Sequence, residues 1–349
     1  MRVLVTGGCG YIGSHTIVVL QEAGHDVICV DNCSNSDAST IAAICEITGK
    51  TPLFYPIDLC DAAALAKVFD ENPDIAAIIH FAAFKAVGES VENPVKYYYN
   101  NLVSLLNLLR EVERRRTTIQ TFVFSSSCTV YGEPEHIPVS EDTPEKPAES
   151  PYGATKQMCE RILRDFVGVG GSRHPIHVSL LRYFNPAGAH PSLKIGERGY
   201  GPNLVPRLVG VASQKQPSPF RIFGGDYATA DGTPVRDFIH VCDIAEAHRL
   251  AIEVPPPPYP TPSPTSSKGS LRVLNLGAGR GITVLEALQT FVRVSDVDVS
   301  YEIGPRRPGD VSAIYADNRR ACHELGWTLK YDLSDIMRTA WDFERRPHI

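Results

Sequence analysis

The sequence predicts an α/β fold, because short apolar segments typical of buried strands alternate with amphipathic helical segments through the first half of the chain. A glycine-rich turn, Gly7-Gly-Cys-Gly-Tyr-Ile-Gly13, joins the first strand to the first helix. After Asn185 the alternation ends, and Gly and Pro become frequent. We therefore expect a Rossmann-type, doubly wound parallel sheet over residues 1–185. A smaller mixed α/β lobe for substrate is expected over residues 186–349, with some segments returning to the first domain.

The individual elements follow from local patterns along the chain. The run Val3-Leu-Val-Thr6 is a short apolar strand that ends in glycines, and the helix after it stops near Gly24. Strands are expected over residues 3–6, 26–30, 53–57, 75–81, 121–124 and 177–182. Helices are expected over residues 12–23, 62–70, 102–115 and 152–167. The third of these helices places leucines on one face and charges on the other, as a helix packed on a sheet does.

Composition and charge limit the function. With 349 residues, 43% of them hydrophobic, the chain is long enough for a large core and two lobes. A net charge of −6 gives no general attraction to nucleic acid or to an anionic membrane. No apolar run reaches the roughly 18 residues that span a bilayer, and a strand that begins at Arg2 or Val3 leaves no room for a signal peptide. Nine scattered cysteines without a Cys-x-x-Cys spacing indicate reduced thiols rather than a metal site. We expect a cytoplasmic protein with no nucleic-acid or membrane partner.

The glycine turn has the spacing of a dinucleotide site. Gly7, Gly10 and Gly13 let the backbone turn tightly and approach a pyrophosphate at the N-terminus of the next helix. Asp31 follows the second strand, where a carboxylate accepts bonds from ribose hydroxyls and repels a 2′-phosphate. The sequence therefore predicts NAD rather than NADP. Asp58 closes the third strand and is expected near the adenine amine, although either acid could be an ordinary strand-end residue.

Tyr152 and Lys156 form the most informative pair in the chain. Residues four apart share a face of a helix, so the Lys156 ammonium can approach the Tyr152 phenol. A free phenol has a pKa of about 10, and a nearby cation lowers that pKa. A bound oxidised nicotinamide adds a second positive charge. Together with Ser127, the pair predicts a tyrosine that moves a proton beside a hydride-transfer cofactor.

Seven motifs resemble those of one enzyme family. They are Thr6-Gly-Gly-Cys-Gly-Tyr-Ile-Gly-Ser-His15, Phe81-Ala-Ala-Phe-Lys-Ala-Val-Gly-Glu-Ser90, Ser125-Ser-Ser-Cys-Thr-Val-Tyr-Gly132, Ser150-Pro-Tyr-Gly-Ala-Thr-Lys156, Leu181-Arg-Tyr-Phe-Asn-Pro-Ala-Gly-Ala-His190, Asp231-Gly-Thr-Pro-Val-Arg-Asp-Phe-Ile-His240 and Pro305-Arg-Arg-Pro-Gly-Asp310. They resemble the UDP-glucose 4-epimerases of the extended short-chain dehydrogenase/reductase superfamily. The resemblance implies that the chain interconverts UDP-galactose and UDP-glucose by transient oxidation at C4, rotation of the 4-keto sugar and re-reduction. It also implies tightly bound NAD that is regenerated in each turnover, a place in galactose metabolism and a homodimer joined through a helix bundle.

The resemblance assigns roles to individual residues. Tyr152 would take the proton of the sugar 4-hydroxyl, Ser127 would bond to the same oxygen, and Lys156 would bond the nicotinamide ribose. NAD is expected to contact Gly7, Gly10, Tyr11, Ile12, Gly13, Asp31, Asn32, Asn35, Asp58, Phe81, Ala82, Lys85, Asn100, Ser125, Tyr152, Lys156 and Tyr183. The UDP-hexose is expected to contact Lys85, Ser127, Tyr152, Phe184, Asn185, Asn203, Leu204, Phe223, Arg236, Arg307, Asp310 and Ile314. Arginine suits a diphosphate because its planar fork donates two bonds.

The chain departs from the family pattern at two places, and the first of them bears on specificity. Ile314 stands where the family often has a large Tyr or a small Cys facing the sugar, so acceptance of UDP-N-acetylhexosamines stays open. Residues 255–270 form a Pro-rich insert that is too polar to pack, and we expect a surface loop there.

Other functions on the same scaffold make different demands. A nucleotide-sugar 4,6-dehydratase would need Asp and Glu after the fifth strand, where this chain has Cys128 and Thr129. A UDP-glucuronate decarboxylase would match less well in the run from Lys85 to Ser90. A catalytically silent NAD-binding protein would lack the Tyr or the Lys of the Tyr-x-x-x-Lys pair. Any one arginine of the second lobe could instead form a surface ion pair.

Overall fold

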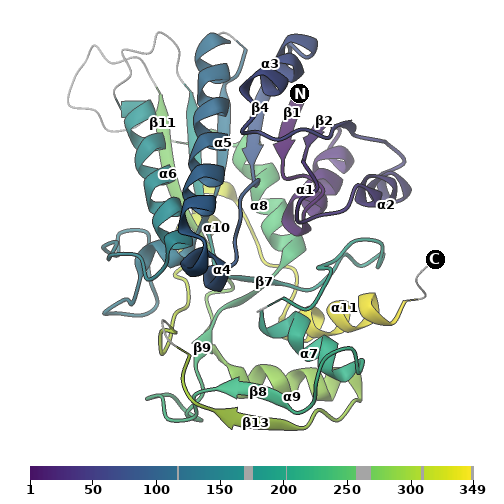
Figure 1. The fold of residues 1–349 in the computed structure, drawn as a ribbon, viewed down its shortest axis with the longest axis vertical. Helices are drawn as coiled ribbons and strands as arrows, with labels where there is room; N and C mark the ends of the chain where they lie inside the picture. Colours follow the sequence, from purple (N-terminus) through teal and green to yellow (C-terminus); the bar gives the residue numbers. More distant parts are fainter. Residues whose placement is uncertain (116–117, 169–175, 202, 257–268, 308–309, 347–349) are drawn as a thin grey trace.

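A seven-stranded parallel sheet forms the centre of the chain in a computed structural model that describes residues 1–115, 118–168, 176–201, 203–256, 269–307 and 310–346 (Figure 1). The strand order is β11-β6-β5-β4-β1-β2-β3, and every neighbouring pair is parallel. The strands are β1 Arg2–Thr6, β2 Asp26–Val30, β3 Leu53–Tyr55, β4 Ile75–His80, β5 Thr121–Ser127, β6 His177–Tyr183 and β11 Ser270–Leu276. The order reverses between β1 and β4, which is where such sheets bind ligands at the carboxyl ends of their strands. The predicted Rossmann-type sheet is confirmed.

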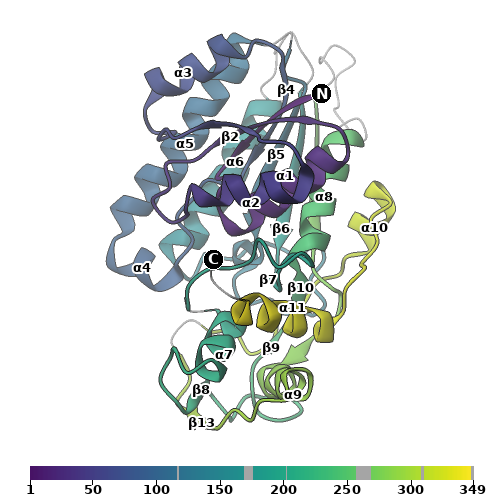
Figure 2. The same cartoon turned by 90° about the vertical axis from the view of Figure 1, so that its right-hand side faces the viewer.

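Helices cover both faces of this sheet because each carries an apolar stripe toward it. One buried cluster joins the sheet to α1 Tyr11–Glu22, α2 Ser39–Thr48, α8 Val241–Glu253 and α10 Arg319–Leu325. A second joins the opposite face to α3 Ala62–Glu71, α5 Pro94–Arg114 and α6 Pro151–Gly168. In the turned view the two sets of helices lie on opposite sides of the strands (Figure 2).

Several boundaries differ from the sequence prediction. Helix α5 begins at Pro94 rather than at residue 102, because proline is well suited to a first helical turn and the aromatic turn after it lacks the leucine pattern. Strand β5 runs on to Ser127. Helix α2 and the short helix α4, Val87–Glu92, fall between the elements that the periodicity indicated.

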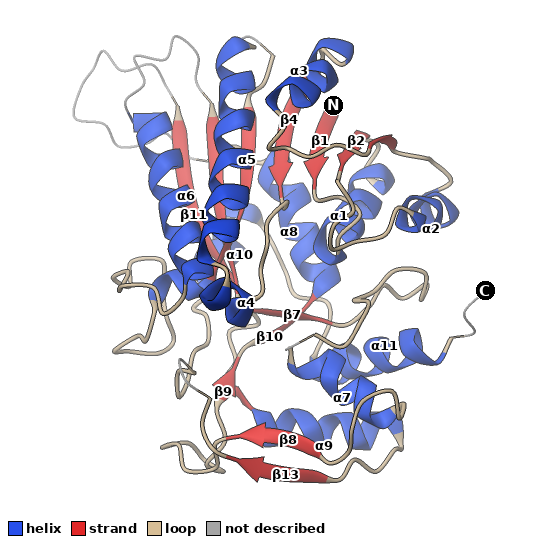
Figure 3. Cartoon of the chain, in the orientation of Figure 1, coloured by secondary structure: helices blue, strands red, loops and turns tan. Residues whose placement is uncertain are grey.

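The remaining elements build a smaller lobe at the carboxyl ends of the strands (Figure 3). Its helices are α7 Leu204–Ala212, α9 Val284–Ser295 and α11 Leu333–Arg345. Its strands are β7 Asn185–Ala187, β8 Phe220–Phe223, β9 Val235–Arg236, β10 Phe238–His240, β12 Ile282–Thr283 and β13 Tyr301–Gly304. A third buried cluster, which includes Leu208, Phe291 and Trp341, holds this lobe together.

The chain crosses between the two parts more than once. Helix α8, strand β11 and helix α10 come from the second half of the sequence but pack on or in the large sheet. The Pro-rich segment 255–270 lies outside the described residues except at its ends, and Ser270 already belongs to β11. Among the described helices, none is both long and apolar enough to span a bilayer. The boundary between residues 185 and 186 stays a prediction.

Candidate active site

The turn between β1 and α1 requires glycine at two positions. Gly7 has a φ of +68°, and a Cβ on it would lie 2.7 Å from the Ala82 nitrogen. A Cβ on Gly13 would lie 2.2 Å from the Gly7 carbonyl oxygen. Helix α1 follows Gly10 with no side-chain cap, so the N–H groups of its first turn, at Tyr11 and Ile12, have no partner within the helix. This close-packed turn at a helix N-terminus fits the pyrophosphate of a dinucleotide.

Asp31 connects this turn to the end of β2. Its Oδ2 accepts a hydrogen bond of 3.0 Å from the Cys9 N–H, and its Oδ1 accepts from the Cys33 N–H at 2.9 Å. Asn32 donates to the Asp58 carboxylate at 3.1 Å, so these predicted adenosine contacts lie together beyond β2 and β3. Strand β3 ends at Tyr55, and Asp58 therefore lies in the following loop rather than in the strand.

The other predicted cofactor residues surround the same strand ends. Phe81 directly follows β4 and donates its N–H to the Thr6 carbonyl at 3.1 Å. Asn100 lies on α5 and donates to the Asn101 side chain at 3.0 Å. Asn35 is exposed in the loop after β2. Tyr11 donates its hydroxyl to the Gly188 carbonyl at 2.6 Å and so bridges the two lobes.

Ser127, Tyr152 and Lys156 converge at the end of β5. Tyr152 and Lys156 lie in the first turns of α6, which packs against β5. Lys156 is buried and donates to the Ser125 carbonyl at 2.7 Å, and its Nζ lies 5.8 Å from the Tyr152 ring centroid. Ser127 is the last residue of the strand, and its Oγ accepts from the Thr129 N–H at 3.2 Å. The three residues that the sequence singled out are therefore neighbours.

Burial controls the charge states of this pair. It raises the pKa of Tyr152 to about 12, although a hydrogen bond with Ser127 lowers that pKa and Cys128 raises it further. Burial also lowers the pKa of Lys156 to about 8. The sequence predicted that Lys156 lowers this pKa; in the protein alone the Tyr152 pKa is raised instead, and burial is the largest cause.

Phe184 and Ile314 belong to a buried cluster that includes the turn after Ser127. They share a buried cluster with Val130, Val139 and their neighbours, and Cys128 packs against it. Ile314 is 5% exposed, so its side chain is part of this buried cluster. Tyr183 is buried too, and its hydroxyl lies 2.5 Å from His248 Nε2, which indicates a packing role. Burial raises its pKa well above the usual value.

Arg236 lies on β9 and faces the segment around residue 310. Its Nη1 donates to the Val311 carbonyl at 2.9 Å, and its Nη2 lies 3.4 Å from Asp310 Oδ1. Asn185 begins β7 and donates its N–H to the Asp237 carbonyl at 2.9 Å. Arg236 is thus held by its own side-chain contacts with residues 310 and 311, and Asn185 by a backbone bond to the residue between β9 and β10.

Three arginine side chains surround the ring of Phe223. The Arg307 guanidinium lies 4.3 Å from the ring centroid, and those of Arg207 and Arg221 lie 5.4 and 5.7 Å away. The structure thus brings Phe223 next to Arg307, both of which the sequence analysis expected to contact the UDP-hexose, and adds two arginines that it did not name. Burial and the Arg307 charge lower the pKa of Arg207, which marks a place suited to an anion.

Glu197 is a residue that the sequence analysis missed. Its carboxylate accepts from Asn203 Nδ2 at 3.2 Å and lies 3.5 Å from Lys85 Nζ. It therefore connects a predicted cofactor residue with a predicted substrate residue at the N-terminus of α7, next to Leu204. No local pattern marks it, because Lys85 is more than a hundred positions away in the chain. Among the described residues, no group of three His, Cys, Asp or Glu side chains could hold a metal ion.

Comparisons with known proteins agree with this geometry. The family model described as "NAD dependent epimerase/dehydratase family" matches residues 3–258. The chain is 46% identical over 346 residues to a UDP-glucose 4-epimerase of Bacillus subtilis (strain 168), covering 99% of this chain and 97% of that one. It is 44% identical to UDP-glucose 4-epimerase uge1 of Schizosaccharomyces pombe, with 99% and 94% covered.

Solved structures give the same result. A Stenotrophomonas maltophila UDP-glucose-4-epimerase with bound NAD and formylated UDP-arabinopyranose superposes with a TM-score of 0.90 at 43% identity, covering 99% of this chain and 98% of that one. A Bifidobacterium longum UDP-glucose 4-epimerase in complex with NAD+ and UDP has a TM-score of 0.89 at 41% identity, with 99% and 98% covered.

Proposed function

This chain belongs to the UDP-glucose 4-epimerases of the NAD dependent epimerase/dehydratase family, and from that premise we propose that it interconverts UDP-galactose and UDP-glucose. The observation that carries the proposal is the convergence of Tyr152, Lys156 and Ser127 at the end of β5. This end of the sheet also holds the glycine turn, which fits a dinucleotide. A hydroxyl can then be deprotonated next to a bound redox cofactor.

The residues around the glycine turn would hold NAD. Gly7, Gly10 and Gly13 would leave room for the pyrophosphate, and Asp31, which accepts a bond from the Cys9 N–H of the same turn, would bind the adenosine ribose. The chemistry that NAD supplies when bound is reversible oxidation at a carbon that bears a hydroxyl. Lys156 places a cation beside the Tyr152 ring and would bond the nicotinamide ribose.

Proton transfer falls to Tyr152. In its phenolate form it takes the proton of the sugar 4-hydroxyl as the hydrogen at C4 leaves as hydride. After the 4-keto sugar has turned, hydride would return to the opposite face of C4, and Tyr152 returns the proton to the same oxygen. Ser127 lowers the pKa of that phenol by hydrogen bonding, and it orients the same oxygen of the substrate. Burial opposes the phenolate, so a second positive charge in the site is needed to make Tyr152 a base near neutral pH.

The smaller lobe would grip the nucleotide while the hexose turns. Arg236 and Arg307 supply guanidinium groups for the diphosphate, and Phe223 offers a ring for the uracil. Asn203 would bind the same ligand. Asn185, Leu204 and Asp310 complete the predicted nucleotide contacts.

N-acetylated UDP-hexoses are a second substrate class that we infer from Ile314. This side chain packs on Phe184 and is smaller than a tyrosine. A UDP-Glc/GlcNAc 4-epimerase from Campylobacter jejuni, 36% identical with a TM-score of 0.81, carries such a dual activity in its name.

We infer a cytoplasmic homodimer. All nine cysteines are free thiols, which suits a reducing compartment. Helix α5 exposes Val95, Tyr99 and Leu106, which together with the partly buried Leu102 form an apolar stripe. The spacings of four, three and four residues place this α5 stripe on one helical face, where a second copy could cover it.

The deciding experiment incubates the purified protein with UDP-galactose, without added NAD, and follows the sugar protons by NMR. Conversion to UDP-glucose is expected, because NAD should copurify. Tyr152→Phe should lower kcat by about 10²- to 10⁴-fold while NAD stays bound. If the parent stays inactive even with NAD supplied, the epimerase proposal fails. If Tyr152→Phe keeps full turnover, only the role of Tyr152 fails.

A further inference from the structure

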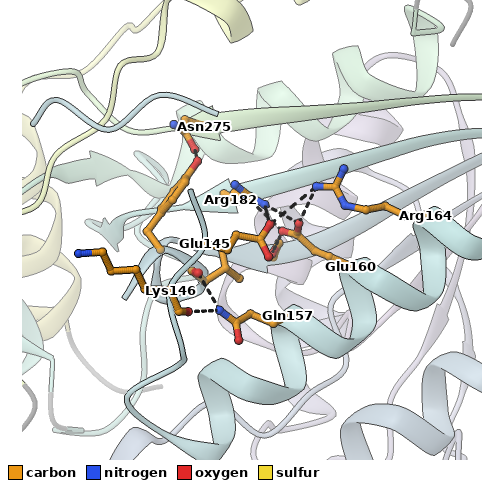
Figure 4. Close-up of polar contacts among 10 residues, drawn as sticks. Glu145, Lys146, Gln157, Glu160, Arg164, Arg182 and Asn275 are labelled. Carbon is orange, nitrogen blue, oxygen red and sulfur yellow. Dashed lines mark hydrogen bonds and ion pairs between the residues drawn. The ribbon is translucent and has the colours of Figure 1, made fainter. Parts of the chain in front are cut away.

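A buried ion pair contacts the strand that carries Ser127. Glu160 on α6 and Arg182 on β6 are each 1% exposed. Arg182 Nε donates to Glu160 Oε1 at 2.9 Å, and its Nη2 donates to Oε2 at 2.6 Å, so both carboxylate oxygens are engaged (Figure 4). Arg164 donates to the same carboxylate at 3.2 Å, and Glu145 accepts from Arg182. No cofactor, substrate or catalytic role was predicted from the sequence for Glu160, Arg182, Arg164 or Glu145.

The pair contacts the strand residues on which the proposed chemistry depends. Glu160 accepts a hydrogen bond of 2.6 Å from the Ser126 hydroxyl. Ser126 stands between Ser125, whose carbonyl receives Lys156, and Ser127. Tyr152, Lys156 and Glu160 are four residues apart on α6 and so form one stripe of that helix. One helical stripe therefore fixes three consecutive residues of β5.

The same pair also holds the turn that follows Ser127. Arg182 is the lateral partner of Ser126 in β5 and of Asn275 in β11, so the three form a row across the sheet. The Arg182 guanidinium lies 4.7 Å from the ring centroid of Tyr131, which ends the 3-10 turn Cys128–Tyr131. The Tyr131 hydroxyl donates to Asn275 at 2.6 Å. Ser127 is thus fixed through its neighbours on both sides.

A contribution to the stability of the fold is a weak explanation for the buried Glu160–Arg182 pair. Two charges lose their hydration on burial, and apolar residues of similar size often replace a buried ion pair with no loss of stability. Geometry gives a stronger reason, because two bonds between planar groups fix a distance and an angle between α6 and β6. We propose that Glu160 and Arg182 are positioning residues that hold Ser127 and Tyr152 at the separation needed for proton transfer. This inference rests on the proposed function.

The test is an apolar pair variant, Glu160→Met with Arg182→Met. It leaves no buried charge unpaired, because Arg164 and Glu145 lie 3.9 Å apart and both reach solvent. A melting temperature near that of the parent is expected, with KM for UDP-galactose within about threefold. Turnover should fall by about 100-fold, the cost of a misplacement near 1 Å. The pH of half-maximal kcat should rise, because the Ser127 bond that lowers the Tyr152 pKa is weakened.

A double-mutant cycle with Ser127→Ala shows whether the pair acts through Ser127. In the parent, Ser127→Ala should lower kcat by at least about 10-fold, whereas in the apolar pair variant it should change kcat by less than about threefold. Equal effects in both backgrounds, or full turnover of the apolar pair variant, would overturn the positioning role alone. Full turnover of Ser127→Ala in the parent would instead reject the catalytic role of Ser127 in the proposed function.

Two further variants complete the comparison. Arg161→Met with Asp165→Met removes an exposed pair, 2.9 Å apart, from the same helix and should leave kcat within about twofold. If the apolar pair variant does not fold, Glu160→Gln replaces it in the cycle, because it keeps the size of the side chain and an acceptor for Ser126. The same non-additivity is expected there, and additive effects would again overturn the proposal.

Discussion

Lys156 is buried in a place where its charged form is destabilised. Its ammonium is buried between β5 and α6, with one hydrogen bond to the Ser125 carbonyl and the Phe124 ring 4.9 Å away. Burial lowers its pKa from 10.5 to about 8, which corresponds to a cost of about 3 kcal/mol for the charged form. We expect a residue kept at such a cost to serve the proposed reaction rather than the fold.

Lys156→Met should therefore stabilise the protein while it abolishes most activity. The lost bond to Ser125 costs about 1–3 kcal/mol, so a net gain of about 1 kcal/mol is expected at pH 7. Lys156 binds its proton more weakly in the native state than in the unfolded state. The free-energy cost of burying the charged ammonium is therefore full below pH 8, and it disappears as the pH rises toward 10.5 and the unfolded state also loses the proton. Urea denaturation of nucleotide-free protein between pH 7 and pH 10 measures this gain. Exposed Lys50→Met is the control, and a gain that grows with pH would contradict the account.

Ile314→Gly should widen the sugar site. The turnover of UDP-N-acetylgalactosamine relative to UDP-galactose is expected to rise by at least about 10-fold, because we infer that the removed side chain, which lies in one cluster with Phe184, faces the sugar. Its burial also predicts a stability loss of about 2–5 kcal/mol. Val139→Ala, in the same buried cluster, is the matched control for that loss and should leave the ratio unchanged. An unchanged ratio in Ile314→Gly would show that another wall sets specificity.

At the scale of elements, the junction of β1 and α1 is determined by contacts that only glycine permits. Gly13 lies in the first turn of α1, where its Cα packs on the Gly7 carbonyl. This contact brings the helix N-terminus close to the end of the strand, which is what a pyrophosphate site requires. Ser127 and Tyr152 are positioned in the same way, by the end of one strand and the start of one helix.

Gly13→Ala should abolish retention of NAD. The added Cβ would meet the Gly7 oxygen at 2.2 Å, so the turn must open. The ratio of NAD to protein after purification, read from its absorbance, measures the effect. Gly88→Ala is the control, since nothing lies within 4 Å of a Cβ there. If Gly13→Ala carries as much NAD as the parent, the turn does not hold the cofactor.

At the scale of the whole molecule, the α5 stripe is an exposed apolar surface that a second copy would cover in the proposed homodimer. Val95 is 78% exposed and Tyr99 60%, although both sit on a helix whose other face packs in the core. Helices α5 and α6 lie side by side at one side of the sheet, and Met158 of α6 is exposed too (Figure 1). A pair of such helices from each copy would bury all of these side chains in a four-helix interface.

Val95→Glu with Tyr99→Glu should convert a dimer into a monomer. Two like charges placed at the centre of an apolar interface would lose their hydration without a partner. Light scattering after size exclusion gives the molar mass of each species. Ile303→Glu, which changes an exposed apolar residue of β13, should leave the dimer intact. A parent that elutes as a monomer would reject the dimer, and an unaffected double variant would place the interface elsewhere.

The sequence by itself determined the features that depend on neighbours in the chain. Helical periodicity placed Tyr152 and Lys156 on one face, and the order of strand, glycine turn and helix indicated the cofactor site, because backbone geometry is the same wherever it occurs. Only the tertiary structure decided the placement of β11 beside β6, the contact of Glu197 with Lys85, and the Glu160–Arg182 pair. It also reversed the expected direction of the Tyr152 pKa. These features depend on burial and on contacts between distant segments, and both arise only when the whole chain has packed.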